Sequence, residues 1–303
     1  MVMARVLISG GSGLIGQVLR IRLEEKGYDV ALLGRSSKKD HGTASFAWDI
    51  TKGEIDTEAL NNCDYIIHLA GANIGAKRWT PKRKQEIRVS RIDSANLLYA
   101  NLDKQKTKLK AFISSSAIGY YGAISSEHVF KEADPPADDF LGRVCRDWEQ
   151  AADQFKESGI RTVKIRTGIV LSKEGGALSK LRIPVKWGLG SPVGDGKQYM
   201  PWIHINDLCD MYIHALEQED MQGAYNAVAP QHVNNKDFTR KLARAMGKPF
   251  WAPNVPAFAL KLLFGEMSVM LLTGSRISPE KIREAGFSFT FPDLDSALHE
   301  LLS

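Results

Sequence analysis

The chain has 303 residues, of which 44% are hydrophobic and 25% are charged, and its formal net charge is +5. These values are ordinary for a globular protein, and the length is enough for one large α/β domain plus a smaller one. The basic excess is small, and no stripe of interleaved basic and aromatic residues stands out. We therefore expect no nucleic-acid partner.

The cysteines are three in number and lie far apart in the chain, at Cys63, Cys145 and Cys209. No pair of them has the spacing of a metal site, so we expect no metal ion. An odd, scattered set is typical of free thiols in a reducing compartment. This favours a cytoplasmic location.

One long apolar stretch runs over residues 257–272, and it is interrupted by Lys261, Gly265 and Glu266. These interruptions argue against a membrane span. No charged-then-apolar leader precedes Arg5. We expect no membrane partner, and we interpret the stretch as a core or pocket-lining helix.

The first elements are an apolar run at 5–9, the glycine-rich segment 10–16 (GGSGLIG) and an amphipathic stretch at 17–26. This order predicts a strand, a tight turn and a helix. Glycines let the backbone turn sharply and approach a phosphate, while the helix N-terminus directs free N–H groups at the anion. Both G-x-G-x-x-G and G-x-x-G-x-x-G spacings fit, which indicates a dinucleotide site. The contacts predicted from this segment are Gly10, Ser12, Gly13, Leu14, Ile15 and Gly16.

Strand and helix patterns then alternate along the chain. Apolar runs at 29–33, 46–48, 65–69, 111–115 and 162–165 predict strands, and 81–104 and 140–158 predict helices. Alternation of this kind is typical of a doubly wound parallel sheet of the Rossmann type, an α/β fold. Ligands of such sheets lie beyond the carboxyl ends of the strands.

The composition changes after Leu171, where glycine and proline become frequent. Residues 206–216 then predict a helix and 224–228 a strand. We interpret residues 1–172, with a return segment at about 205–228, as a dinucleotide-binding domain. Residues 173–204 and 229–303 would form a smaller α+β substrate-type domain.

The end of the second strand indicates which dinucleotide is bound. An NAD site usually has a carboxylate there, but the chain has Gly34, Arg35 and Ser36, and no acidic residue lies between Val30 and Lys39. A guanidinium at Arg35 suits a 2′-phosphate, so NADP(H) is favoured over NAD(H). Two further segments are expected at the cofactor. Asp49 would hold the adenine edge, and the small residues after Leu69, which are Ala70 and Gly71, would let the backbone pass close to the ribose and phosphates.

With these motifs the chain resembles the extended short-chain dehydrogenase/reductase superfamily, the NAD-dependent epimerase/dehydratase group. It is most similar to an atypical epimerase-like subfamily of unknown substrate. The residues that carry the resemblance are Trp79, the segment 119–122 (GYYG), 147–149 (DWE), 201–204 (PWIH) and the tail from Pro256 to Leu302. The resemblance implies an NADP-type cofactor held by Gly34, Arg35, Leu69, Ala70, Glu86, Arg91 and Val170.

Enzymes of this superfamily use a serine and a Tyr-x-x-x-Lys pair, in which the tyrosine exchanges a proton and the lysine one turn later lowers its pKa. Ser116 matches the serine. Counting back from Glu149, however, Leu141 and Cys145 occupy the tyrosine and lysine positions, and no Tyr-x-x-x-Lys occurs in residues 130–160. The chain therefore departs from the family's chemistry.

Several side chains remain as substitutes. Tyr120 and Tyr121 are catalytic candidates or pack on the sheet edge, and Cys145 is a reactive or an inert thiol. Arg166 contacts the cofactor, holds another anionic group or bridges the two domains. His204 and Trp202 are candidate substrate contacts, with a helix-entry role for His204 and a core role for Trp202 as the alternatives.

Two functions follow. The first is an NADP(H)-dependent epimerase-like oxidoreductase that acts on a hydroxyl- or carbonyl-bearing small molecule, with nucleotide sugars as the usual class in the superfamily. The second is a catalytically silent NADP(H)-binding sensor, consistent with the cell-division label that some members of the subfamily carry. The helices expected at 81–104 and 140–158 are also where a homodimer commonly forms in this superfamily, although the pattern does not require one.

Overall fold

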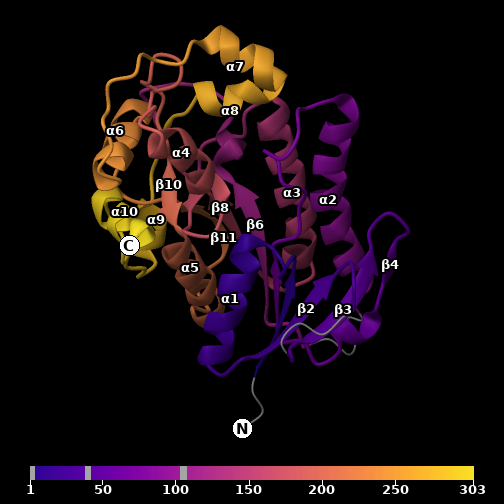
Figure 1. Ribbon diagram of the computed structural model, residues 1–303. Helices are drawn as coiled ribbons and strands as arrows, with labels where there is room; N and C mark the ends of the chain where they lie inside the picture. Colours follow the sequence, from indigo (N-terminus) through magenta and orange to yellow (C-terminus); the bar gives the residue numbers. More distant parts are fainter. Residues whose placement is uncertain (1–3, 38–41, 103–107) are drawn as a thin grey trace.

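A computed structural model describes residues 4–37, 42–102 and 108–303 (Figure 1). Its centre is an eight-stranded sheet in the order β11-β8-β6-β5-β1-β2-β3-β4, parallel throughout except for β4, which runs antiparallel to β3. The strands are β1 (Arg5–Ser9), β2 (Asp29–Gly34), β3 (Ala44–Asp49), β4 (Glu54–Ile55), β5 (Tyr65–His68), β6 (Ala111–Ala117), β8 (Arg161–Thr167) and β11 (Gly223–Ala227). The expected Rossmann-type parallel sheet is confirmed.

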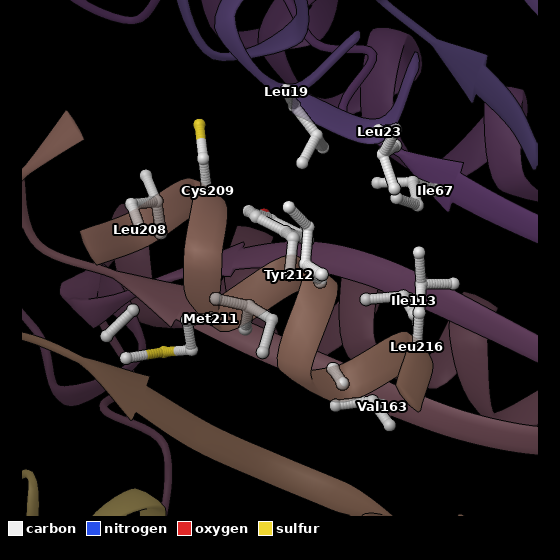
Figure 2. Packing of buried hydrophobic residues seen from close by; sticks show 14 of the residues in the cluster. Leu19, Leu23, Ile67, Ile113, Val163, Leu208, Cys209, Met211, Tyr212 and Leu216 are labelled. Atoms are coloured by element: carbon white, nitrogen blue, oxygen red, sulfur yellow. The ribbon is translucent and has the colours of Figure 1, made fainter. Parts of the chain in front are cut away.

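Helices cover both faces of this sheet. Val6 and Ile8 of β1 pack in one apolar cluster and Leu7 packs in another, because successive strand residues point to opposite faces. The first cluster is closed by α1 (Leu14–Glu25) and α5 (Ile205–Glu217), and Figure 2 shows Leu19, Tyr212 and other side chains of these helices meeting residues of the strands. The second is closed by α2 (Pro81–Ala100) and α3 (Phe140–Glu157).

The element bounds differ from the sequence-based ones by a few residues. Helix α2 begins after Thr80, whose side chain accepts a hydrogen bond from the Arg83 N–H, and it ends at Ala100, short of the expected residue 104. A proline at the first helical position and a capping threonine before it explain why this start was readable from the sequence.

A second, smaller core lies beside the large sheet. It is formed by α4 (Gly176–Lys186), α6 (Asn235–Ala245), α10 (Leu294–Leu302) and the two-stranded parallel sheet of β9 (Ile169–Leu171) and β10 (Trp202–His204). Trp202 and Phe238 are among its fully buried side chains. A further pair, β7 (Val129–Phe130) and β12 (Arg276–Ile277), precedes α9 (Glu280–Glu284). The proposed division into domains stays a prediction, although α5 and β11 do return to the large sheet.

The apolar stretch at 257–272 lines a pocket, which is one of the two expected roles, and it forms neither a core helix nor one continuous helix. It is divided into α7 (Ala257–Phe264), a 3-10 turn (Gly265–Ser268) and α8 (Val269–Leu272). Of the α7 residues, all of them described, Leu260 alone is buried. These helices lie across the end of the molecule where α2 and α3 begin, so one side of α7 faces solvent (Figure 1). No helix in the described part of the chain is long and apolar enough to cross a membrane.

Candidate functional site

The turn after β1 brings three strand ends together. The Gly10 N–H donates to the Leu33 carbonyl at 3.2 Å, and the Leu69 N–H donates to the Ser9 carbonyl at 3.0 Å. Gly10 has φ of +75°, and a Cβ there would lie 2.9 Å from the Ala70 nitrogen. Both facts restrict the position to glycine. The expected meeting of the 10–16 and 69–71 segments is therefore present.

Helix α1 presents an open N-terminus at this turn. Gly13 precedes its first residue without a capping side chain, and the first turn of this fully described helix holds no carboxylate. A Cβ at Gly16 would lie 2.6 Å from the Gly11 Cα, so the helix packs directly on the turn. Ser12 and Gly13 are exposed, and Leu14 and Ile15 are half-buried. Unpaired N–H groups and the positive end of the helix dipole suit an anion.

Arg35 lies just beyond β2 on the same side of the sheet. It is exposed and forms no ion pair with any residue that the structure describes. The neighbouring position has room, because a Cβ at Gly34 would meet nothing within 4 Å in the described chain. The Ser36 carbonyl accepts from the Ser45 hydroxyl, and Asp49 accepts the N–H groups of residues 51 and 52. The Arg35 guanidinium, exposed just beyond the end of β2, therefore suits a phosphate in addition to the anion at the start of α1.

Arg91 and Glu86, two residues of α2 that are expected at the cofactor, differ in their surroundings. Arg91 is packed against Gly71 and donates to the Ala72 carbonyl at 3.1 Å, while burial lowers the pKa of its guanidinium. Its position supports the loop after β5. The side chain of Glu86 is 57% exposed, and a hydrogen bond from Arg83 lowers the pKa of its carboxyl group. The cofactor contacts expected of both residues stay predictions.

The segment after β9 passes over the start of α1. The Val170 carbonyl lies 3.2 Å from the position of a Cβ at Gly176, and that same position lies 3.2 Å from the Leu14 side chain. Gly176 thus lies between Val170 and the first residue of α1, and the cofactor contact of Val170 stays a prediction.

His68 lies beneath the glycine turn and was not singled out from the sequence. Its ring is fully buried, with Nδ1 2.7 Å from the Ser9 hydroxyl and Nε2 3.0 Å from the Ser94 hydroxyl. Burial lowers the pKa of His68 to about 4. A neutral imidazole therefore joins β1, β5 and α2. The one feature of the sequence that could have drawn attention to His68 is that it is a polar residue in an otherwise apolar strand.

Ser116 belongs to a buried polar network. Its hydroxyl donates to Glu149 at 2.7 Å, and the same carboxylate accepts two bonds from Arg166, Nε to Oε1 at 2.8 Å and Nη2 to Oε2 at 2.9 Å. Arg166 also donates to the Tyr121 hydroxyl at 2.9 Å and to the Glu132 carbonyl at 3.2 Å. The buried guanidinium of Arg166 is thus engaged within the protein, which favours a structural role, and its cofactor contact stays a prediction.

The two tyrosines after β6 are not equivalent. They lie in a 3-10 turn (Ile118–Tyr121), where the Tyr121 hydroxyl is buried and donates to Asn226 at 2.8 Å. Burial raises the pKa of Tyr121 to about 12. Tyr120 is half-buried, with its ring centroid 3.4 Å from the Arg166 Cζ. Of the two, Tyr120 is therefore better placed to meet a ligand.

Leu141 and Cys145 face this turn from α3. A Cβ at Gly119 would lie 3.4 Å from the Leu141 Cβ and 3.5 Å from the Cys145 Sγ. The thiol is buried, and burial raises its pKa to about 12. Burial therefore favours the inert alternative for Cys145, and neither side chain matches the acid–base chemistry of a Tyr-x-x-x-Lys pair.

The structure favours structural roles for Trp202 and His204, and the substrate contacts predicted for them stay predictions. Both side chains are fully buried. Trp202 lies in the smaller core. His204 accepts the Asn206 N–H at the start of α5 and its Nε2 lies 2.9 Å from the Glu300 carboxylate. His204 thus has the helix-entry role, and Trp202 has the core role, that the sequence analysis gave as alternatives.

A cavity of about 980 Å³ opens beside these elements. It is lined by residues from three segments, 125–127, 194–199 and 257–274. Val269 lines it and also packs in one apolar cluster with Leu141 and Val144. Val269 therefore lies between the cavity and the part of α3 where the superfamily carries its tyrosine, and the cavity is large enough for a small-molecule ligand.

Comparison with known proteins agrees with this architecture. Residues 6–228 match the NAD dependent epimerase/dehydratase family, and residues 255–301 match a domain of unknown function, DUF1731. The chain is 35% identical over 305 residues to the epimerase family protein SDR39U1 of Bos taurus, covering 99% of this chain and 100% of that protein. It is 36% identical over 300 residues to the epimerase family protein YfhF of Bacillus subtilis, covering 98% of each.

Solved structures show the same relationship. The crystal structure of human epimerase family protein SDR39U1 (isoform 2) with NADPH superposes with a TM-score of 0.87 at 34% identity, covering 98% of both chains. MoeE5 in complex with UDP-glucuronic acid and NAD shares the fold at 19% identity, with a TM-score of 0.79 over 99% of both chains. The sheet, the glycine turn and these similarities together show that the chain belongs to the NAD dependent epimerase/dehydratase family.

Proposed function

We propose that the protein binds NADP(H) and uses it as an oxidoreductase on a hydroxyl- or carbonyl-bearing small molecule. The observation that carries the proposal is the cavity of about 980 Å³, one of whose lining residues, Val269, packs in the same apolar cluster as Leu141, because a protein that only bound the dinucleotide would not need a cavity of this size. A nucleotide sugar is the substrate class that the family suggests. The crystallised human relative contains NADPH, which supports the choice of cofactor.

The residues present fit such a cofactor. The uncapped end of α1 and the close approach of Gly10 to Ala70 suit a pyrophosphate, and Arg35, which pairs with none of the described residues, suits a 2′-phosphate. When bound, NADPH supplies a hydride. The chain would hold it by the turn, by Arg35 and by the loop that Arg91 supports.

The acid–base role is proposed for Tyr120. Its pKa is raised mainly by burial, so it carries its proton at neutral pH and acts as a donor to a developing alkoxide. The Arg166 guanidinium on its ring face stabilises the phenolate that remains. Ser116, bonded to Glu149, would position the substrate oxygen. Tyr120, Arg166 and Ser116 would together replace the missing Tyr-x-x-x-Lys pair, although they are not arranged as that pair is.

A catalytically silent sensor is the second candidate. It is favoured by the apolar Leu141, by the inert Cys145 and by the commitment of Ser116 and Arg166 to a buried network. Turnover separates the two candidates, because a sensor binds NADPH with no hydride acceptor.

The test is NADPH oxidation against a panel of sugar-nucleotide and simple carbonyl compounds, with Ala257→Trp as the cavity-filling variant. Ala257 lines the cavity, whereas Ala259 on the same helix does not and serves as the matched control. We expect Ala257→Trp to lower kcat/KM at least tenfold, which corresponds to a loss of about 1.4 kcal/mol or more of transition-state stabilisation. The NADPH Kd should stay unchanged. Oxidation at the buffer rate with every compound would support the sensor.

Two further expectations, on cellular location and on oligomeric state, accompany the proposal. The three cysteines are free and buried, in keeping with the reducing, cytoplasmic location that we propose. The homodimer through α2 and α3 also stays a proposal.

A further inference from the structure

We propose that the protein binds the surface of an anionic phospholipid bilayer through one exposed apolar face. This face consists of Ile183, Trp187, Leu189, Trp251, Phe258, Leu262 and Leu263. It lies outside the cofactor crevice, and the proposal does not depend on the proposed function. It revises the expectation of no membrane partner, and it concerns a surface contact rather than a span.

The exposure of these side chains is unusual for a monomer. Trp187 is 76% exposed, Trp251 67%, Phe258 74% and Leu262 79%. A single exposed leucine needs no explanation, but several large apolar side chains on neighbouring segments mark a contact surface. Helix α7 is the extreme case, since Lys261 is its only residue with a polar side chain.

The segments that carry this face are joined by hydrogen bonds. The Gly194 N–H donates to the Val255 carbonyl at 2.9 Å, and the Val255 N–H donates to the Pro192 carbonyl at 2.8 Å. Further back, Pro249 lies 3.7 Å from the position of a Cβ at Gly188. Residues 188–194 and 249–255 thus run together, with Trp187 and Trp251 near one end and α7 leaving the other.

The charge on the same segments is of one sign. Residues 175–194 and 238–265 contain no aspartate or glutamate, whereas outside them acidic residues outnumber basic ones by 35 to 32. The whole positive excess of the chain is therefore concentrated here. The basic residues are Lys180, Arg182, Lys186, Arg240, Lys241, Arg244, Lys248 and Lys261.

Part of this charge is neutralised within the protein. Lys241 and Arg244 pair with Asp295, and Arg240 pairs with Asp237. Arg182, Lys186, Lys248 and Lys261 form no ion pair with any residue that the structure describes. The first carboxylate after α7 in the sequence is Glu266, which pairs with Lys84.

An anionic bilayer matches this combination better than a second copy of the chain. In a two-fold dimer the same patch meets itself, so the unpaired cations would be brought against one another. Surfaces that insert into the headgroup region typically combine tryptophan, phenylalanine and leucine with lysine and arginine, since the rings enter the headgroup layer and the cations meet lipid phosphates.

The test is co-sedimentation of the full-length protein with phosphatidylcholine vesicles that contain or lack phosphatidylglycerol, at low salt and at about 0.5 M NaCl. We expect binding to the anionic vesicles alone, weakened by salt. Tryptophan emission should shift to the blue on binding, because the other four tryptophans are at most 8% exposed and Trp187 and Trp251 provide the change.

Two variants separate the contributions. Lys186→Glu with Lys248→Glu should weaken binding at least about tenfold, and so should Leu262→Glu. The matched controls are Arg143→Glu on α3 and Ile21→Glu on α1, which are exposed elsewhere and should bind as the natural chain does. Circular dichroism and the thermal midpoint confirm that each variant is folded.

Three results would overturn the proposal. The first is no binding to anionic vesicles at low salt, and the second is equal binding to both kinds of vesicle. The third is a dimer in solution that Leu262→Glu converts to monomer, which would assign the face to a second copy.

Discussion

Glu149 and Arg166 form a two-pronged ion pair inside the protein, with side-chain exposures of only 7% and 3%. The pair joins α3 to β8, and through Ser116 and Tyr121 it reaches β6 and the turn after it. Burial by itself lowers the pKa of Arg166, but the hydrogen bonds and charge of Glu149 outweigh it and raise the pKa. The guanidinium therefore stays charged and depends on its partner.

Replacing Glu149 by glutamine should be strongly destabilising. The change leaves the Arg166 charge buried without compensation, and we expect the free energy of unfolding to fall by about 3 kcal/mol. Urea unfolding measures it. Asp153→Asn is the control, because Asp153 pairs with Lys164 nearer the surface, and its loss should be about 1 kcal/mol or less. Equal effects for the two variants would contradict a special role for the buried pair.

Arg35→Asp should abolish the preference for the phosphorylated cofactor. The guanidinium forms no ion pair in the described chain, so its removal costs the fold little. We expect the NADPH Kd to rise between about tenfold and a hundredfold, with NADH affinity unchanged or improved. Fluorescence titration measures both. Lys26→Asp, at the far end of α1, should alter neither Kd; a matching loss there would indicate a general charge effect.

Gly10→Ala should damage both stability and cofactor binding. The new Cβ would require φ of +75° and would lie 2.9 Å from the Ala70 nitrogen. We expect a loss of at least about 2 kcal/mol in the free energy of unfolding, together with weaker NADPH binding. Gly159→Ala is matched for conformation, since φ is +81° and nothing lies within 4 Å of its Cβ, and it should cost about 1 kcal/mol. A cost at Gly10 no larger than at Gly159 would exclude the close approach as a cause.

Acid should weaken the fold through His68. The unfolded chain binds a proton on this ring below about pH 6.5, whereas burial lowers the folded pKa to about 4. The stabilisation is therefore complete above pH 6.5 and is lost as the pH falls toward 4, by about 3 kcal/mol. Denaturant unfolding across this range should show a steeper loss for the natural chain than for His68→Gln. Parallel curves would refute the assignment.

The thiols should be unreactive in the folded protein. Cys63, Cys145 and Cys209 are buried, and burial raises the pKa of each to about 12. A colorimetric disulfide reagent at about pH 8 should label none of them until guanidinium is added, after which all three should react. Rapid labelling of Cys145 in the native state would reopen its catalytic candidacy.

Much of the architecture could be predicted because its causes are local. The glycines at 10–16, the apolar runs of three to five residues and the threonine and proline at the start of α2 each determine backbone conformation within a few neighbours. Strand–helix alternation then leaves a parallel sheet as the main solution. The position of Ser116 and the lack of Tyr-x-x-x-Lys could also be predicted, because both depend on short sequence motifs.

What the tertiary structure alone decided is which side chains meet and which face water. Arg166 reaches Glu149 across 17 residues, Tyr121 reaches Asn226 across 105, and His68 joins Ser9 across 59. The sequence left the roles of Trp202 and His204 open, and the fold buries both, whereas it exposes α7 although that helix is almost wholly apolar. Local sequence sets the conformation of an element, but burial and side-chain contacts depend on how elements from distant parts of the chain pack together.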